Sequence, residues 1–189
     1  MERYVPPFSI TNRMLSMVAQ IAEKTGRISN YHSLEAKPHL RRNNRIRSIH
    51  SSLAIEANSL SLDEVRSVIS GKTVVGPQKE IQEVKNAYQA YGMLGDFDPY
   101  DLNDLKKLHG VMTYLTERES GEFRSHNEGV FNGDCCIFMA PPPQLVPGQM
   151  EVLFDWMREA RGEVHPLILS SVFHYEFVFI HPFADGNGR

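Results

Sequence analysis

The sequence predicts a mainly α-helical protein that carries one small β-hairpin. Three observations lead to this fold class. Apolar residues recur every three or four positions through most of the chain, which is the spacing of a helical face. A longer apolar segment, 167–180, has the length of a buried helix. The strongest strand signal is the dipeptide Asn132-Gly133, which is typical of a hairpin turn.

The composition fits one globular domain with a small N-terminal arm. Hydrophobic residues make up 41% and charged residues 23% of the 189 residues, which is ordinary for such a domain. The net charge of −3 provides no basic field for nucleic acid or a membrane surface. The chain has no apolar run of about 18 residues and no secretory signal, and its two cysteines are adjacent and cannot form a disulfide framework. We therefore expect a cytoplasmic protein that binds no membrane.

Residues 1–38 are predicted to form an N-terminal helical arm. Thr11 or Asn12 would cap a helix over 8–28, and Gly26 suits its end. The apolar residues on one side of this helix are Ile10, Met14, Met17, Val18 and Ile21. Residues 30–38 are expected to form a connection to the main domain, 39–189.

A basic stretch, 39–50, opens the main domain. Its arginines are Arg41, Arg42, Arg45 and Arg47. They allow two interpretations, a nucleic-acid patch or a solvated helix face. Because no aromatic residues are interleaved to stack on bases, we favour the solvated face and expect no nucleic acid to bind this segment. The helix should run on to Glu56 and break at Asn58, so Ser52 and Glu56, four residues apart, face the same side.

Further helices are expected before the hairpin. Ser61 and Glu64 match the capping-box pattern at the start of a helix over 62–70. A loop over 72–77 leads to an amphipathic helix over 79–94, and another follows over 101–118. His109 lies on this last helix, where we expect a structural or partly exposed role.

Residues 119–147 differ from the rest because they contain glycines and a proline triplet. Residues 129–139 are predicted to form the β-hairpin, whose open edge suits an extended peptide of a partner protein. Cys135 and Cys136 lack the spaced partners of a zinc site, so we assign them to packing. A helix over 148–161 follows, and Pro166 starts the last helix.

The last helix leads to the string His181-Pro-Phe-Ala-Asp-Gly-Asn-Gly-Arg189. Pro182 disfavours helical geometry at the preceding residue, so the helix should stop and leave His181 at the mouth of a turn. There His181 is placed to act as a base toward an incoming hydroxyl group. The alternative is a polar turn with a core histidine.

The residues after His181 predict a phosphate cradle. Glycines allow backbone N–H groups to converge on an anion, and Gly186, Asn187 and Gly188 follow one another here. Arg189 adds a cationic group, and Asp185 is placed to hold a divalent metal against the same phosphates.

The string 181–189 resembles the signature of the Fic family, His-Pro-Phe-x-Asp-Gly-Asn-Gly-Arg, at all eight specified positions. The resemblance implies a Fic-type helical bundle that transfers AMP from ATP to a protein hydroxyl. In that case His181 deprotonates the target, Asp185 holds Mg²⁺, and the segment 186–189 grips the phosphates of ATP.

Two other segments resemble parts of Fic proteins. Residues 39–58 are similar to the inhibitory helix, with Ser52 and Glu56 in its motif and Ala57 where the family most often has glycine. In the family this glutamate pairs with a second arginine of the signature, which would lie beyond Arg189, so we expect Glu56 to lack that partner. Residues 119–147 resemble the flap, whose positions 129–131 (Gly129, Val130 and Phe131) would cover the nucleotide while the flap positions the target side chain.

The resemblance therefore implies a protein adenylyltransferase, held inactive by Glu56, with Mg²⁺ and ATP as cofactor and substrate. It also implies a protein substrate that docks at the flap, and it is compatible with self-modification and with a homodimer. Transfer of another nucleotide, UMP or GMP, is one alternative, and a non-catalytic regulatory or binding module is the other. Because family members continue past the signature, we expect this chain to be a fragment of a longer protein with little activity by itself.

Overall fold

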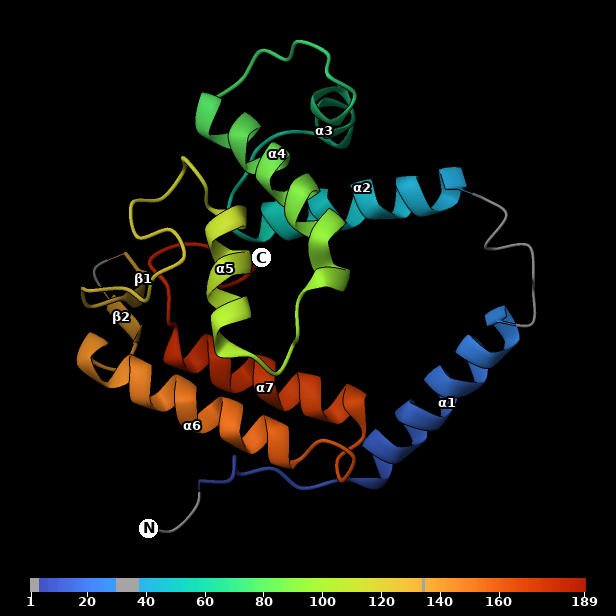
Figure 1. Ribbon diagram of the computed structural model, residues 1–189, viewed down its shortest axis with the longest axis vertical. Helices are drawn as coiled ribbons and strands as arrows, with labels where there is room; N and C mark the ends of the chain where they lie inside the picture. The colour runs from blue at the N-terminus through green and yellow to red at the C-terminus, as the bar shows by residue number, and fades with distance from the viewer. Residues whose placement is uncertain (1–3, 30–37, 134) are drawn as a thin grey trace.

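The computed structural model describes residues 4–29, 38–133 and 135–189 (Figure 1). The fold is mainly helical with one small hairpin, as predicted. The helices are α1 (Asn12–Ser29), α2 (Pro38–Ile55), α3 (Leu62–Ile69), α4 (Gln78–Met93), α5 (Leu102–Met112), α6 (Val146–Glu159) and α7 (Pro166–Ile180). The strands are β1 (Gly129–Asn132) and β2 (Cys135–Met139), and short 3-10 turns occupy Leu94–Asp96 and Pro143–Leu145.

Two clusters of buried apolar side chains form the core. The first joins α6 and α7 to the loop that follows α7, and it includes Leu153, Phe177 and Phe183. The second joins α2, α3 and α4, with Leu53 and Val84 among its most buried members. Burial of such side chains is the main stabilising term for a domain of this size.

Helix α5 connects the two clusters. It runs between α4 and α7 in Figure 1. Leu102 and Leu105, near its start, pack against the first cluster, whereas Leu108, Val111 and Met112 pack against the second. The candidate site lies where α5, α4, the end of α2 and the end of α7 meet.

Helix α1 lies apart from the other helices in Figure 1. It begins at Asn12 rather than at residue 8, with the Thr11 hydroxyl accepting the Met14 N–H (3.2 Å) as a cap. It continues through Gly26 to Ser29, so the expected end at Gly26 is wrong. Its large apolar residues Leu15, Met17, Ile21 and Ile28 are exposed. The division into an arm and a main domain stays a prediction, and most of the expected connection, 30–37, lies outside the described residues.

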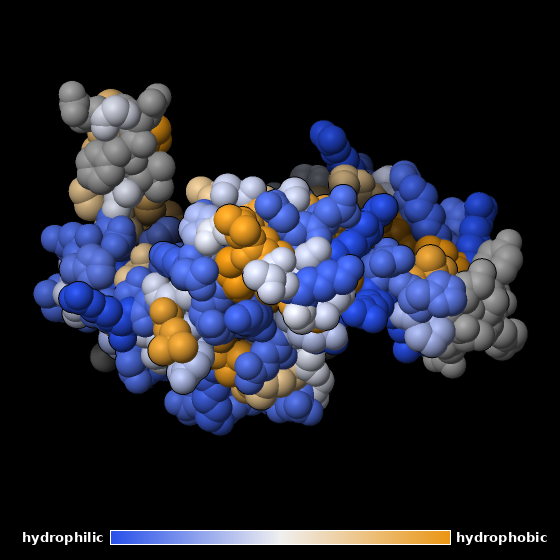
Figure 2. Space-filling model, turned by 90° about the horizontal axis from the view of Figure 1, so that it is seen from above, coloured by the Kyte–Doolittle hydropathy of each residue, from blue (hydrophilic) through white to orange (hydrophobic). Residues whose placement is uncertain are grey.

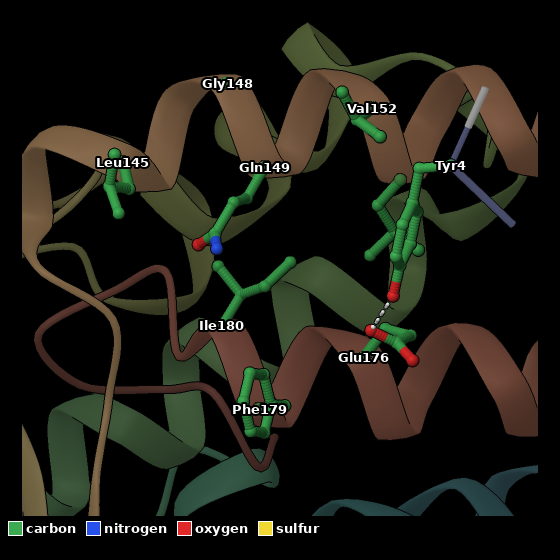
Figure 3. Close-up of a pocket in the computed structure, with 9 residues that line it drawn as sticks. Tyr4, Leu145, Gly148, Gln149, Val152, Glu176, Phe179 and Ile180 are labelled. Carbon is green, nitrogen blue, oxygen red and sulfur yellow. Dashed lines mark hydrogen bonds between the residues drawn. The ribbon is translucent and has the colours of Figure 1, made fainter. Parts of the chain in front are cut away.

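The segment before α1 packs on α6 and α7. The Phe8 ring stands edge-on to Trp156, with 6.1 Å between centroids. Tyr4 lies over a cavity of about 590 Å³ lined by residues of α6 and α7 (Figure 3). There its hydroxyl donates to the buried Glu176 carboxylate (2.8 Å). Burial, and then this carboxylate, raise the pKa of Tyr4 to about 12.

Helices α2 and α3 form largely as predicted. Arg41, Arg42 and Arg47 are exposed, as a solvated face requires, but Arg45 lies 4.6 Å above the Tyr88 ring and donates to the Tyr88 carbonyl (2.6 Å). Before α3, the Ser61 hydroxyl accepts the Glu64 N–H and the Glu64 carboxylate accepts the Ser61 N–H, so the capping box is confirmed.

Helix α5 is shorter than predicted, because it ends at Met112 instead of residue 118. The Thr113 N–H (2.9 Å) and hydroxyl group (2.8 Å) both donate to the His109 carbonyl, so the helical hydrogen bond persists to this residue. Leu115 then has a left-handed backbone, with φ of 61°. The apolar spacing through Leu115 continues past the point where the helix stops.

The hairpin is antiparallel, with Gly129 opposite Met139 and Asn132 opposite Cys135. Its register shifts between Val130 and Phe131. Cys135 and Cys136 are exposed free thiols, so their assignment to packing is wrong. The residues of β2 are exposed apart from Phe138, which is half-buried.

The exterior is mainly polar on the face seen from above, where hydrophobic side chains form small separate patches (Figure 2). Of the helices in the described residues, none combines the length and apolar character of a membrane span.

Candidate active site

His181 lies at the C-terminal end of α7. Its backbone is left-handed (φ 51°, ψ 61°), and its N–H donates to the Phe177 carbonyl (2.9 Å). Pro182 explains this sharp stop, since it disfavours right-handed helical geometry at His181. Within the described residues the imidazole makes no hydrogen bond, although His181 is half-buried. A histidine held in this way is available to accept a proton from a bound molecule.

Asn187 closes the loop that follows His181. Its side-chain carbonyl accepts the Phe183 N–H (3.0 Å), and its amide group donates to the Phe183 carbonyl (2.7 Å). Both residues are buried. The Asn187 side chain therefore braces the loop, and its direct contact with a phosphate stays a prediction.

His109 supports the same loop from α5, which confirms the structural alternative expected for it, although its partners were not predicted. Its ring stacks on Phe183 at 3.7 Å with an interplanar angle of 6°. Nδ1 accepts the Gly121 N–H (3.0 Å), which requires the proton to be on Nε2, where it donates to the Asp185 carbonyl (2.9 Å). Burial lowers the pKa of His109 despite the nearby Asp185. The neutral imidazole thus fixes the main chain of the loop.

Asp185 has two carboxylate oxygens with different surroundings. Oδ1 accepts the Gly186 N–H (2.7 Å) and the Nη2 group of Arg189 (3.0 Å). Oδ2 accepts from the Lys79 ammonium group (3.1 Å). Burial alone would raise the pKa of Asp185, but the positive charges of Arg189 and Lys79 hold it below its ordinary value.

The two glycines of the loop are required by close contacts. Gly186 has φ of 84°, and a Cβ there would lie 3.2 Å from the Thr113 side chain and 3.3 Å from that of His109. A Cβ on Gly188 would lie 3.0 Å from the Ile55 side chain. The expected backbone cradle is thus packed directly against α5 and the end of α2.

The Glu56 carboxylate is the anion bound to this cradle. Its Oε1 accepts the Gly188 N–H (2.6 Å), and its Oε2 accepts from Nε of Arg189. We expected Glu56 to lack the second arginine of the signature as its partner, and in the described structure it pairs instead with Arg189, a contact that we did not predict. Glu56 and Arg189 are 133 positions apart in the chain, which is why the sequence did not reveal the contact.

Arg189 joins three carboxylates, and its side chain is only 2% exposed. Besides Glu56, Nη2 donates to Glu83 (3.1 Å) and to Asp185 (3.0 Å). Burial would lower the pKa of Arg189, but the negative charges of these carboxylates raise it. Among the described residues its Nη1 atom is buried without a hydrogen-bond partner.

The turn after α2 places Glu56 at the cradle. Ala57 has a left-handed backbone, with φ of 66°, so the chain reverses directly after Glu56. The Asn58 amide then donates to the Glu83 carboxylate (2.8 Å), and the Ser59 hydroxyl and N–H donate to Glu80. Ser52 is half-buried one turn earlier, and the described residues show no hydrogen bond between it and Glu56.

The first turns of α4 supply two site residues that sequence reasoning missed, Lys79 and Glu83. The Glu83 side chain is 5% exposed, and it accepts from both Asn58 and Arg189. The sequence did contain an indication that Glu83 is buried, because it lies beside Val84 on the face of α4 that the apolar pattern predicts to be buried. The apolar pattern could not indicate which residues would pair with the buried Glu83 carboxylate.

Arg124 anchors the flap to the loop after α7. Its side chain is buried and donates to four backbone carbonyls, those of His126 (2.7 Å), Pro141 (2.6 Å), Ile180 (3.3 Å) and His181 (2.7 Å). Burial lowers its pKa. A guanidinium group suits this position because its planar fork presents five donors and satisfies the carbonyls at a helix end.

The flap stands beside α7, where the Phe138 and Phe179 rings lie 5.4 Å apart. Gly129 pairs with Met139 at the base of the hairpin. The backbone of Val130 and Phe131 belongs to β1, but the placement of their side chains over the nucleotide lies outside what the structure describes.

The residues present fit a Mg²⁺ ion that is coordinated jointly by the protein and by the phosphates of a nucleotide. The described residues contain no group of three or more metal-ligating side chains. Mg²⁺ commonly binds one or two carboxylates together with substrate phosphates and water. Asp185, beside a backbone cradle for anions, provides the carboxylate that such a site needs.

Comparison with known proteins identifies proteins that are similar to this chain in sequence and in fold. A sequence model of the Fic/DOC family matches residues 99–189. The chain is 46% identical to a Fic family protein from Desulfovibrio desulfuricans G20, whose crystal structure superimposes with a TM-score of 0.92. This match covers 98% of the present chain and 57% of that protein's chain.

Curated proteins are similar at greater distance. The protein adenylyltransferase Fic of Nematostella vectensis is 30% identical over 151 residues, covering 75% of this chain and 34% of that protein. The protein of the same name from Culex quinquefasciatus is 31% identical over 186 residues, covering 90% of this chain and 35% of that protein. The chain therefore spans about a third of the length of these curated relatives.

Proposed function

Because residues 99–189 belong to the Fic/DOC family, we propose that this chain carries out protein adenylylation, the transfer of AMP from ATP to a Ser, Thr or Tyr hydroxyl of a protein. The observation that supports it best is the imidazole of His181, which has no hydrogen-bond partner among the described residues. The loop that follows it provides a backbone cradle that already binds an anion, the Glu56 carboxylate. The names of the curated relatives agree with this activity.

In this reaction the hydroxyl oxygen of the target attacks the α-phosphorus of ATP, and the bond to the pyrophosphate oxygen breaks. His181 accepts the hydroxyl proton, and pyrophosphate leaves with the electron pair of the broken bond. The Gly188 N–H group and Arg189, once Glu56 has left them, stabilise negative charge on the phosphates. Mg²⁺ held by Asp185 would neutralise further phosphate charge.

We propose that Glu56 inhibits this reaction by occupying the phosphate site. Its carboxylate takes the Gly188 N–H and the Arg189 guanidinium group, which are two donors that a phosphate would use. A second negative charge cannot enter the same cradle without repulsion. Displacement of Glu56 would release these donors for the nucleotide.

The flap is the proposed docking surface for the target protein. Ile137 and Met139 of β2 are exposed, at 64% and 55%, and the hairpin has open edges that can pair with an extended peptide. The same surface of a second copy would serve in self-modification, which gives a convenient readout when the target is unidentified.

The test is incubation of the protein with α-³²P-ATP and Mg²⁺, followed by detection of label on protein. We expect Glu56→Gly to raise labelling by about tenfold or more, because removal of the competing charge is worth at least this factor. His181→Ala in the same background should lower labelling by about 100-fold, the usual contribution of a general base.

Exposed Glu163 offers a matched control, since Glu163→Gly removes a carboxylate that precedes α7, at the opposite end of this helix from His181. Labelling in the Glu56→Gly variant that persists after His181→Ala would contradict the proposed base. An absence of label, with ATP bound by the Glu56→Gly variant and candidate targets present, would contradict the transferase. Competition by unlabelled UTP and GTP identifies the preferred base.

A further inference from the structure

Lys79 is the most exposed member of the charged network at the site. Its side chain is 55% exposed, whereas those of Arg189 and Glu83 are 2% and 5% exposed. It extends from the first turn of α4, and its ammonium group lies 3.1 Å from Oδ2 of Asp185 and 3.9 Å from Oε1 of Glu83. Its flexible stem allows it to leave these partners without disturbing the core.

The contact with Lys79 is specific to one oxygen of Asp185. Oδ1 is saturated by the Gly186 N–H and by Arg189, which are both fixed parts of the loop. Oδ2 has Lys79 as its partner among the described residues. The oxygen that is free of the loop is thus the one a cation from solution would bind, and Lys79 already neutralises it.

We propose that Lys79 is an internal counter-ion that competes with the divalent cation for Oδ2 of Asp185. The inference rests on the proposed function, in which Asp185 holds Mg²⁺. Without metal, Lys79 neutralises Asp185 and keeps the site assembled. Metal binding displaces the ammonium group. Because this ion pair must break, the site binds the divalent cation more weakly than it would without Lys79.

The surrounding charges support displacement of Lys79 rather than of Arg189. Arg189 is buried and shared among Glu56, Glu83 and Asp185, so its removal would leave uncompensated buried charges. His109 is held neutral, and it contacts the backbone carbonyl of Asp185 rather than the carboxylate. Lys79 is therefore the cation that can be exchanged at low cost.

The test measures binding of Mn²⁺, as a paramagnetic substitute for Mg²⁺, by loss of the free-ion signal in electron paramagnetic resonance. Lys79→Gln should bind Mn²⁺ about three- to ten-fold more tightly than the wild type, as expected for loss of a competing exposed ion pair and its like charge. Lys79→Arg retains the cation and should resemble the wild type. No turnover is needed for this readout.

Lys85, exposed on the same helix, provides the matched control, because Lys85→Gln removes the same charge away from Asp185. Its Mn²⁺ affinity should stay within about twofold of the wild type, since exposed charges at a distance are screened. The gain from Lys79→Gln should disappear in an Asp185→Asn background. Unchanged or weaker Mn²⁺ binding by Lys79→Gln, or a gain that persists with Asp185→Asn, would overturn the inference.

These outcomes are distinguishable from failure of the proposed function. If Asp185→Asn alone binds Mn²⁺ as the wild type does, Asp185 is not the metal ligand, and both the metal role in the transferase and the competition fail. If Asp185→Asn abolishes the site while Lys79→Gln changes nothing, only the role of Lys79 fails. Thermal unfolding monitored by circular dichroism verifies that each variant is folded.

Discussion

At the scale of single residues, Ala57 adopts a left-handed backbone conformation, which residues that carry a Cβ atom avoid. Its φ of 66° costs an L-residue about 1–2 kcal/mol, whereas glycine adopts it freely. Part of that gain is offset by the greater freedom of glycine in the unfolded chain. We expect Ala57→Gly to raise the free energy of unfolding by about 0.5–1 kcal/mol in urea denaturation.

Ala54, three residues earlier on the exposed side of α2, is the control for this prediction. There the same substitution should destabilise the protein by about 0.5–1 kcal/mol, because glycine is a poor helix former. Equal effects at the two positions would show that the left-handed turn is not strained. The family resemblance drew attention to position 57, and the backbone geometry gives the physical reason.

His109 predicts a pH dependence of stability. Burial holds the pKa of His109 below that of an unfolded histidine, about 6.5, so the unfolded chain takes up the proton first as the pH falls. The stability is therefore complete above about pH 6.5 and is lost on acidification below it. We expect the free energy of unfolding to fall by about 1 kcal/mol between pH 7 and 5.5.

Measurements on His109→Gln isolate this effect from that of the other histidines. Glutamine retains a donor for the Asp185 carbonyl but does not titrate, so this variant should start less stable and lose less stability over the same pH range. Parallel curves for the two proteins would contradict the assignment. The sequence placed His109 on α5 but gave no sign of its contacts with Asp185 and Gly121, which come from distant loops.

At the scale of elements, Arg124 ties the flap to the end of α7. We expect Arg124→Lys to lower the free energy of unfolding by about 2–3 kcal/mol, since an ammonium group cannot satisfy the same buried carbonyls. Hydrogen exchange should become faster over 126–141 and 181–188. The exposed Arg118, changed to lysine, is the control, and equal protection patterns in both variants would contradict the anchoring role.

The positions of the helices were predictable from the sequence where the spacing of one apolar face and the residues at the helix ends determine them. The start of α7 at Pro166 and its end before His181 follow from local rules, as does the capping box of α3. The end of α5 was not predictable from spacing, because the backbone becomes left-handed at Leu115 while the apolar pattern continues. The exposure of Cys135 and Cys136 depends on which layers cover the hairpin, which no local pattern contains.

At the scale of the whole molecule, two apolar clusters are joined by α5. Leu53 in one cluster and Leu153 in the other are each 1% exposed. The same substitution can therefore be compared in the two clusters. We expect Leu53→Ala and Leu153→Ala each to cost about 3 kcal/mol. Because α5 contributes side chains to both clusters, both variants should unfold in one transition by near- and far-ultraviolet circular dichroism. Two separate transitions would show that the clusters are independent units.

The site itself could be predicted only in part from the sequence. The string 181–189 indicated a base, a metal ligand and an anion cradle, because their residue types lie close together in the chain. Glu83 and Lys79 were missed because α4 approaches the string only in three dimensions, through Arg189 and Asp185. Arg189 was expected to grip phosphate, whereas here it is neutralised by carboxylates from other elements.

The four acceptors of Arg124 are main-chain carbonyls, and every amino acid supplies one. Substitution at His126, Pro141 or Ile180 therefore cannot delete the acceptor at that position. In the proposed function the flap docks the target protein, so substitutions of its side chains would change the docking surface and still leave Arg124 its four acceptors. The attachment of the flap to the loop that holds His181 is thus insensitive to the identity of those side chains.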